Sequence, residues 1–428
     1  MELNLKNYDI TSVQRGIFFE SLVNLESNFY SIQSIYKLKG IFNLKNLLEA
    51  ARFMAEKHPI FRSRFFLDHN GTPKQSVVEN YKISYQVFEN YSSKPIEEYL
   101  IEDRKIGFDL EEGRLIRGTI IKESEQSFTL IFSYHHILLD GWSAGLAKNE
   151  FFSLYDRLNL GEQLDFENIK PNNIFLNFCN KISESENEDK EYWEQLLNDY
   201  KPYSIKELSE YPNSTSDTHQ HNFKLPVNFS LKLLDYAKKK RFTNSTITLA
   251  LYFYFLNTVR GIDDICVGLV TSGRELDEIQ DLETAVGCMM KTIPIRVTNI
   301  KSKSFYEICN ELQNKVLFSI YNSNSSLTAY NNFLGKNKFS DNLFNELYLY
   351  ENYPVEEIEY RTFSIDKNYA IDKNSFPSVT YFCAYDSNIE VEFQVHSPLS
   401  KELATYQITM IELVDSIIEN FNSIGEYK

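Results

Sequence analysis

The stretch HHILLDGWS, residues 135–143, decides how the whole sequence is interpreted. Directly before it, residues 127–134 (SFTLIFSY) alternate in a period of two that predicts a β-strand. Directly after it, apolar residues from Ala144 to Leu154 recur at helical spacing, and Ser143 is a residue type that caps helices. The two histidines are therefore expected in a strand-to-helix loop, where α/β proteins often carry reactive groups.

The adjacent His135 and His136 point to opposite sides if the strand pleat continues, so one can face a channel while the other packs. Histidine transfers protons near neutral pH, and an amine that attacks a carbonyl needs a base nearby. Asp140 can fix the loop through a charge pair, and Gly141 allows a close backbone approach. Two alternatives stay open: a metal site, for which no third ligand stands at His-x-x-x-His or Glu-x-x-His spacing, and two histidines buried in a turn.

The composition excludes several classes of protein. The chain has 428 residues, 43% hydrophobic and 24% charged, which suits one large folded domain or two ordinary ones. Its 44 basic and 60 acidic residues give a net charge of −16, which argues against a nucleic-acid partner. Five cysteines without a Cys-x-x-Cys motif argue against a disulfide framework or a zinc ribbon. No stretch has the pattern of a signal peptide or a membrane span, so we expect a cytoplasmic protein with no membrane partner.

Both halves of the chain mix helical and strand patterns, which predicts two α/β or α+β lobes. The charged segment 181–190 (KISESENEDK) is expected to connect an N-terminal lobe, residues 1–180, to a C-terminal lobe, residues 181–428. Periodicity predicts helices at 43–56, 244–260 and 400–421, and strands at 265–270, 292–297, 344–350 and 389–395.

The full string HHILLDGWS resembles the HHxxxDG signature of nonribosomal peptide synthetase condensation domains, which belong to the chloramphenicol-acetyltransferase-like acyltransferases. Five further segments resemble motifs of that family in the family's order: 10–17 (ITSVQRGI), 57–65 (KHPIFRSRF), 270–274 (VTSGR), 286–296 (VGCMMKTIPIR) and 349–354 (LYENYP). The chain departs from the pattern at Lys291, where the family commonly has Asn, and no further family motif is recognisable at 325–333.

The resemblance implies two chloramphenicol-acetyltransferase-like lobes that form a V-shaped pseudo-dimer around a central channel, with floor-loop and latch-type crossovers from the C-terminal lobe. It implies an acyltransferase of antibiotic and other secondary-metabolite biosynthesis. Donor and acceptor peptidyl carrier proteins would present substrates on phosphopantetheine, and an amine would attack the donor thioester to form an amide. The acceptor is a carrier-bound aminoacyl group or a free amine. The chain itself would hold no cofactor and no metal, and we expect a monomer.

The same resemblance assigns roles to residues of the signature. His136, the second histidine, would be the catalytic residue, as a base or as a group that orients the amine. His135, Asp140 and Gly141 would support the loop, with Asp140 paired to Arg62 and Gly141 offering a backbone N–H to the developing oxyanion.

Five residues are expected to line the channel or shape its edge on the same grounds, although a packing role is the alternative for each. They are Trp142, Ser143, Ser272, Tyr350 and Asn352.

Two other functions stay open. One is a related enzyme, either an epimerisation domain, whose second-half carboxylate motif we do not find, or an ester-forming acyltransferase. The other is a non-catalytic domain that recruits a carrier protein or a tailoring enzyme. No adenylate-forming Gly-rich loop and no carrier serine motif are visible, so we expect loaded carriers to be supplied by other domains, whether the chain is free-standing or excised from a larger synthetase.

Overall fold

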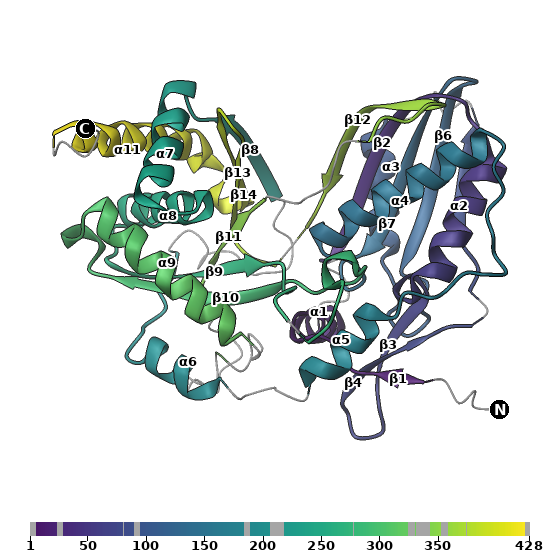
Figure 1. Cartoon of the computed structure of the whole chain (residues 1–428), viewed down its shortest axis with the longest axis horizontal. Helices are drawn as coiled ribbons and strands as arrows, with labels where there is room; N and C mark the ends of the chain where they lie inside the picture. Colours follow the sequence, from purple (N-terminus) through teal and green to yellow (C-terminus); the bar gives the residue numbers. More distant parts are fainter. Residues whose placement is uncertain are drawn as a thin grey trace. The chain divides into compact units, whose positions relative to one another are not determined.

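The computed structural model describes residues 6–23, 29–79, 81–89, 95–183, 189–205, 218–276, 278–323, 330, 343–351, 358–373 and 375–423. These residues divide into two compact units (Figure 1). The first unit comprises Met1–Ser185, Ser272–Met290 and Tyr353–Asn374. The second comprises Glu186–Thr271, Lys291–Asn352 and Ser375–Lys428. The mixed α/β fold class expected from the sequence is confirmed.

The first unit contains five α-helices, eight strands and two short 3₁₀ turns among its described residues. They are β1 (Asn7–Tyr8), α1 (Ser12–Val23), β2 (Ser31–Gly40), α2 (Leu44–Lys57), η1 (Pro59–Arg62), β3 (Ser63–Leu67), β4 (Pro73–Val77), β5 (Ser84–Glu89), α3 (Ile96–Ile106), β6 (Ile116–Ser124), β7 (Ser127–His135), α4 (Gly141–Asn159), α5 (Ile174–Ser183), η3 (Leu282–Thr284) and β12 (Phe363–Ile371).

The main sheet of this unit has the order β12-β2-β7-β6-β5, antiparallel except for the parallel pair β5 and β6. A small sheet, β1-β4-β3, accompanies it. Strand β7 alternates as predicted, because Phe128, Leu130 and Tyr134 join the larger core while Ile131 packs on the opposite face. Helices α2 and α4 pack together over the first of these faces (Figure 1).

The second unit is built around a six-stranded sheet of order β10-β9-β11-β13-β14-β8. Its described elements are α6 (Lys190–Leu197), β8 (Thr218–Lys224), α7 (Val227–Lys240), α8 (Asn244–Arg260), β9 (Asp264–Thr271), β10 (Lys291–Thr298), η4 (Ile300–Ser302), α9 (Phe305–Tyr321), β11 (Glu346–Tyr350), β13 (Ser378–Ala384), β14 (Ile389–His396), η5 (Ser397–Glu402) and α11 (Leu403–Ser423). Helix α8 is almost wholly buried against this sheet, as its continuous apolar sequence predicted.

The domain boundary predicted between residues 180 and 181 lies inside α5, and the first unit continues to Ser185. The middle of the predicted connector, residues 184–188, lies outside the described residues. Two segments from the second half of the chain, Ser272–Met290 and Tyr353–Asn374, belong to the first unit. The floor-loop and latch crossovers stay a prediction. Within the described part of the chain, no helix is long and apolar enough to cross a membrane.

Candidate active site

The two histidines lie where β7 ends and α4 begins, as the sequence predicted. His135 is the last residue of β7, and α4 starts at Gly141. The predicted helix cap is wrong, because Asp140 and not Ser143 caps α4. The Asp140 carboxylate accepts a hydrogen bond from the Ser143 backbone N–H at 2.8 Å, which satisfies a donor that the first helical turn leaves unpaired.

The ring of His136 is fixed in one tautomer. Its Nδ1 lies 2.7 Å from the carbonyl oxygen of Leu139, which can only accept a hydrogen bond, so Nδ1 carries the proton. The backbone N–H of His136 donates to the carbonyl of Tyr30 at 2.7 Å. In the neutral form of this half-buried ring, Nε2 is therefore the nitrogen without a proton and the one that can accept a proton from a substrate.

His135 has a structural environment. Its ring is 5% exposed, and Nδ1 accepts the backbone N–H of Ile137 at 3.2 Å. Nε2 lies 3.3 Å from the hydroxyl of Ser21, which itself donates to a carbonyl and so accepts from His135. Burial, with a smaller contribution from the charge of His136, lowers the pKa of His135 to about 3. His135 is therefore neutral at physiological pH and supports the loop from the side opposite His136.

Asp140 forms its ion pair with Arg274. The Arg274 guanidinium donates from Nη1 to Oδ2 at 3.0 Å and from Nη2 to Oδ1 at 3.2 Å, and both side chains are almost inaccessible to solvent. The expected pairing with Arg62 is wrong. Arg62 donates to the backbone carbonyls of Ala55 and Val78 instead, at 2.7 and 3.0 Å, and so ties η1 to its neighbours. The planar fork of Arg274 matches the carboxylate bidentately, which gives the pair directional strength.

The segment around Gly287 completes this network. Asp140 Oδ2 also accepts the backbone N–H groups of Met289 and Met290, at 2.8 and 3.1 Å. The Ser143 hydroxyl donates to the carbonyl of Gly287 at 2.7 Å and accepts from its N–H at 3.0 Å. Ser143 is fully buried and also accepts from Arg274 at 2.8 Å, so the channel role expected for Ser143 is replaced by a structural one.

The start of α1 supports the histidine loop from another direction. The buried Gln14 side chain donates from Nε2 to the carbonyl of Ile137 at 2.8 Å. Its Oε1 accepts the backbone N–H of Thr11 at 3.0 Å, and the Thr11 hydroxyl donates to the carbonyl of Cys288 at 3.1 Å. Sequence reasoning quoted Gln14 within the opening motif but gave it no role. Its signal was a polar residue on the buried face of an amphipathic helix.

This arrangement joins segments that resemble family motifs, and the comparisons agree with it. Residues 4–406 match the family described as "Condensation domain". The chain belongs to the condensation-domain family. This condensation domain is 26% identical over 423 residues to bacitracin synthase 1 of Bacillus licheniformis, covering 96% of this chain and 8% of that protein. It is 27% identical over 362 residues to gramicidin S synthase 2 of Brevibacillus brevis, covering 82% of this chain and 8% of that protein.

The solved structures similar to this condensation domain show the same fold. One is a variant of the starter condensation domain of rhizomide synthetase, solved in complex with C8-CoA, with a TM-score of 0.80 and 16% identity over 97% of this chain and 95% of that one. The family match and the curated relatives make the chain a condensation domain of the nonribosomal peptide synthetase class, and it spans 8% of the length of each of the two synthetases named above.

The condensation domain places one further charge near His136 that sequence reasoning missed. Asp372 follows β12, whose pairing with β2 brings it to this end of the sheet. Lys373, the next residue, accepts the backbone N–H of Tyr30 through its carbonyl at 2.9 Å, and Tyr30 in turn accepts from His136. Burial raises the pKa of Asp372, while the charge of His136 acts in the opposite direction. No local pattern marks Asp372, because its position depends on a strand more than two hundred residues away from the loop.

The remaining predicted residues are distributed over both units. Gly141 is exposed. Because it is the first residue of α4, its N–H has no partner within the helix. The Trp142 indole N–H donates to the carbonyl of Glu283 at 2.9 Å, while the ring packs under the Arg274 guanidinium. Ser272 turns the chain before Arg274 by donating its hydroxyl to Glu275.

Of the last two predicted channel residues, the structure describes one, Tyr350, which lies in the second unit. Tyr350 ends β11 and is half-buried, and burial raises its pKa. Asn352 lies outside the described residues. Their channel roles, like that of Trp142, stay predictions.

Metal chemistry finds no support within the described ranges, where no group of three or more His, Cys, Asp or Glu side chains is placed to hold an ion. Four of the five cysteines are buried, and burial raises the pKa of the Cys288 thiol beside Asp140. The condensation domain therefore offers one candidate reactive group at the loop, the Nε2 of His136.

Proposed function

We propose that this chain forms an amide bond by transferring a carrier-bound acyl group to an amine, with His136 as the catalytic residue. The observation that carries the proposal is the tautomer of His136. The bond from Nδ1 to Leu139 leaves Nε2 as a hydrogen-bond acceptor, and the loop around it is held by Asp140, Arg274 and Gln14. Such support is what precise positioning of a catalytic group needs.

The chemistry follows from the charge changes of aminolysis. An α-amino group has a pKa of about 7.7–8.0, so part of the acceptor is already neutral and nucleophilic near pH 7. As its nitrogen attacks the thioester carbonyl, it becomes cationic and must lose a proton. Nε2 of His136 hydrogen-bonds to this N–H, which first orients the amine and then takes the proton. The C–N bond forms, the C–S bond breaks, and the proton is returned to the leaving thiolate.

Charge also develops on the carbonyl oxygen of the thioester. Helix α4 starts at Gly141, five residues after His136, and its N-terminus carries a partial positive charge. The N–H of Gly141 has no intrahelical acceptor and is the donor we assign to the oxyanion. Asp140 fixes this helix end, because its carboxylate caps α4 while it pairs with Arg274.

Partners and location complete the proposal. We propose that donor and acceptor carrier proteins present their substrates on phosphopantetheine, or that a free amine replaces the acceptor, and that the domain works as a monomer in the cytoplasm. The net charge of −16 makes basic or apolar local patches the expected contacts for acidic carriers. The chain itself is proposed to hold no cofactor and no metal.

The test separates proton transfer from loop support. In His136→Asn, the amide nitrogen occupies the position of Nδ1 and can still donate to Leu139, but no base remains at Nε2. We expect the rate of amide formation to fall by about 10²–10⁴-fold, as general-base loss commonly gives. Purified chain is offered loaded carriers and a panel of free amines, and products are detected by mass. His69→Ala, in the exposed turn after β3, is the matched histidine control.

The outcomes are distinguishable. A His136→Asn protein that keeps the wild-type rate contradicts the catalytic assignment. A wild-type protein that binds loaded carriers yet forms no amide with any donor and acceptor favours the recruitment function instead. Inversion at the α-carbon of a carrier-bound residue, or ester formation with an alcohol, would identify the related enzymes.

A further inference from the structure

Asp372 is a carboxylate without a role in the proposed chemistry, and it lies on the same face of the main sheet as His136. Ile371, the last residue of β12, pairs with Gln33 of β2, and both side chains contact the α3 side of the sheet. Successive side chains of a strand point to opposite faces, so Asp372 turns toward the other face. That face carries Tyr134 of β7 and, two residues further along the chain, His136.

Backbone hydrogen bonds hold the segment of Asp372 beside the histidine loop. Tyr30 donates its N–H to the carbonyl of Lys373 at 2.9 Å, and its own carbonyl accepts the N–H of His136 at 2.7 Å. Tyr30 therefore bridges the residue after Asp372 to the histidine. Burial raises the pKa of Tyr134, and the charges of Asp372 and Asp140 act on it in the same direction, which agrees with carboxylates on both sides of this ring.

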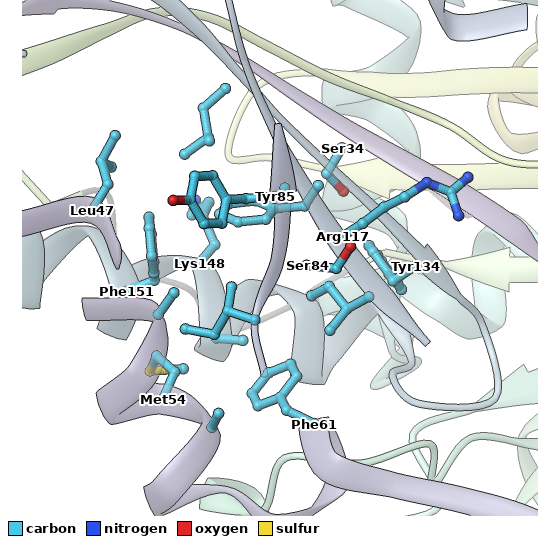
Figure 2. Close-up of a pocket in the computed structure, with 18 of the residues that line it drawn as sticks. Ser34, Leu47, Met54, Phe61, Ser84, Tyr85, Arg117, Tyr134, Lys148 and Phe151 are labelled. Atoms are coloured by element: carbon cyan, nitrogen blue, oxygen red, sulfur yellow. The ribbon is translucent and has the colours of Figure 1, made fainter. Parts of the chain in front are cut away.

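The surroundings on this face are apolar. Tyr134 and Ser34 line an apolar cavity between the main sheet and the α2–α4 layer (Figure 2). One carboxylate oxygen of Asp372, Oδ1, is inaccessible to solvent. Charges interact more strongly where water is excluded, so the carboxylate of Asp372 need not touch the imidazole of His136 to act on it.

The charge of Asp140 is not available to His136. Its carboxylate is neutralised by Arg274 and accepts three backbone N–H groups. His135 is neutral, because burial lowers its pKa to about 3. Yet the ring of His136 becomes an imidazolium when Nε2 takes the amine proton, and a cation in partly buried surroundings is costly without an opposite charge nearby. Asp372 is placed to supply that charge.

A positive charge also acts on Asp372 from α3. Arg104 and His136 both interact electrostatically with this carboxylate, so its charge is shared between them. Lys373 places its ammonium over the ring of Phe29, 5.3 Å from the centroid. The effect of Asp372 on the imidazolium is therefore smaller than that of a contact ion pair. The other titratable or charged side chains of the elements around the loop are Glu20, Tyr30, His135, Asp140, Lys148 and Arg274.

We propose that Asp372 is a positioning residue that acts through His136, by stabilising the imidazolium that forms during amide formation. The inference rests on the proposed function, in which Nε2 takes the amine proton and returns it to the leaving thiolate. Asp372 itself neither gains nor loses a proton in this sequence.

The pH dependence of amide formation tests the proposal. Asp372→Asn keeps the shape of the side chain and removes its charge. The rate should rise with pH as His136 loses its proton. Without Asp372 the imidazolium is less stable, so this rise should move to lower pH by about 0.5–1 unit. The weaker base should also lower the plateau rate by about three- to tenfold. Asp372→Glu restores the charge and should recover most of both effects. One amine is used throughout, so its own titration is common to all variants.

A second readout needs no substrate. The ring resonances of His136 in an NMR titration are identified by their loss in His136→Asn, and their pH midpoint should move down in Asp372→Asn by the same amount. The matched control is Asp366→Asn, an exposed carboxylate of β12 that pairs with Lys39 at 3.1 Å. It lies six residues before Asp372, about 20 Å along the strand, and its loss should move neither midpoint.

The outcomes separate the two proposals. If Asp372→Asn lowers the rate but moves neither midpoint, Asp372 only supports the fold and the inference is wrong. Asp372→Ser replaces Asp372→Asn if the latter does not unfold cooperatively on heating. A shifted ring titration in a protein whose wild type forms no amide retains the role of Asp372 toward His136 and rejects the proposed function. Amide formation with unchanged midpoints in the variant rejects the role of Asp372 alone.

Discussion

Replacing Arg274 with alanine should destabilise the first unit more than an ordinary surface substitution does. The two side chains of the Arg274–Asp140 pair are 4% and 3% exposed, so the variant leaves a buried carboxylate without its counter-charge. Breaking a buried pair in this way costs about 3–5 kcal/mol. Three backbone N–H groups still bond to Asp140, which favours the lower end of that range. A loss of about 3 kcal/mol lowers the melting temperature of a domain of this size by roughly 6–12 °C.

Urea unfolding measures this loss for the first unit alone. The chain has two tryptophans, Trp142 in the first unit and Trp193 in the second, so a Trp193→Phe background makes the fluorescence report on the network around Asp140. A double-mutant cycle with Asp140→Ala and Arg274→Ala should give a coupling free energy of at least about 1 kcal/mol. Each single variant is measured against the same background.

Arg62 supplies the matched control. Arg62→Ala also removes a guanidinium from the first unit, but that half-buried group bonds to backbone carbonyls and shares no hydrogen-bond partner with Asp140 among the described residues. Its cycle with Asp140→Ala should be additive to within about 0.5 kcal/mol. Coupling of Asp140 to Arg62 and not to Arg274 would contradict the ion pair assigned to Asp140.

Three further substitutions test separate contacts. Gln14→Glu removes the N–H donor that supports the histidine loop and should cost about 1–3 kcal/mol in urea unfolding, with a matching loss of activity. In the folded protein His135 has a pKa of about 3, whereas in the unfolded chain it protonates near pH 6.5. Below pH 6.5 the unfolded chain therefore binds a proton that the folded protein does not, and the free energy of unfolding should fall by about 1.4 kcal/mol per pH unit. The His135→Gln substitution should flatten that slope. Gly287→Ala would place a Cβ 2.2 Å from the ring of Phe175 and should lower the free energy of unfolding, measured by calorimetry, by about 1–3 kcal/mol. The control is Gly118→Ala, whose Cβ would have no atom nearer than 4.0 Å and which should change stability by under about 0.5 kcal/mol. A Gly287→Ala protein as stable as the wild type would show that Phe175 can move aside.

Local periodicity was sufficient to predict the elements around the histidines. Strand β7 and helix α8 follow directly from alternation and from a continuous apolar run, since both patterns are set within a few residues. The position of His136 at the end of a strand followed from the same reasoning. The cap of α4 did not, because Asp140 and Ser143 are both good capping residues three positions apart and only geometry separates them.

Long-range contacts were beyond sequence reasoning. The segments that resemble family motifs hold five arginines as possible partners of Asp140, and the correct one, Arg274, is 134 residues away. Asp372 reaches the loop only because β12 pairs with the edge of β2. An apolar cavity between the main sheet and the α2–α4 layer is lined by Gly118, Ala144 and Ala147, and small residues in separate elements carry no signal of their joint position.

The first unit takes two segments, Ser272–Met290 and Tyr353–Asn374, from the second half of the chain, and this has a consequence for synthesis on the ribosome. When the histidine loop emerges, Arg274 has yet to be translated, and at about 5–20 residues per second it follows roughly 7–27 seconds later. Strand β12, which covers the open edge of β2, emerges later still. During that interval the nascent first unit exposes an unpaired strand edge and an unneutralised Asp140, which is the kind of surface that invites wrong pairing. The nascent chain therefore has to delay completion of its first unit until much of the second has been made, and exchange of this domain between synthetases has to carry all three segments together.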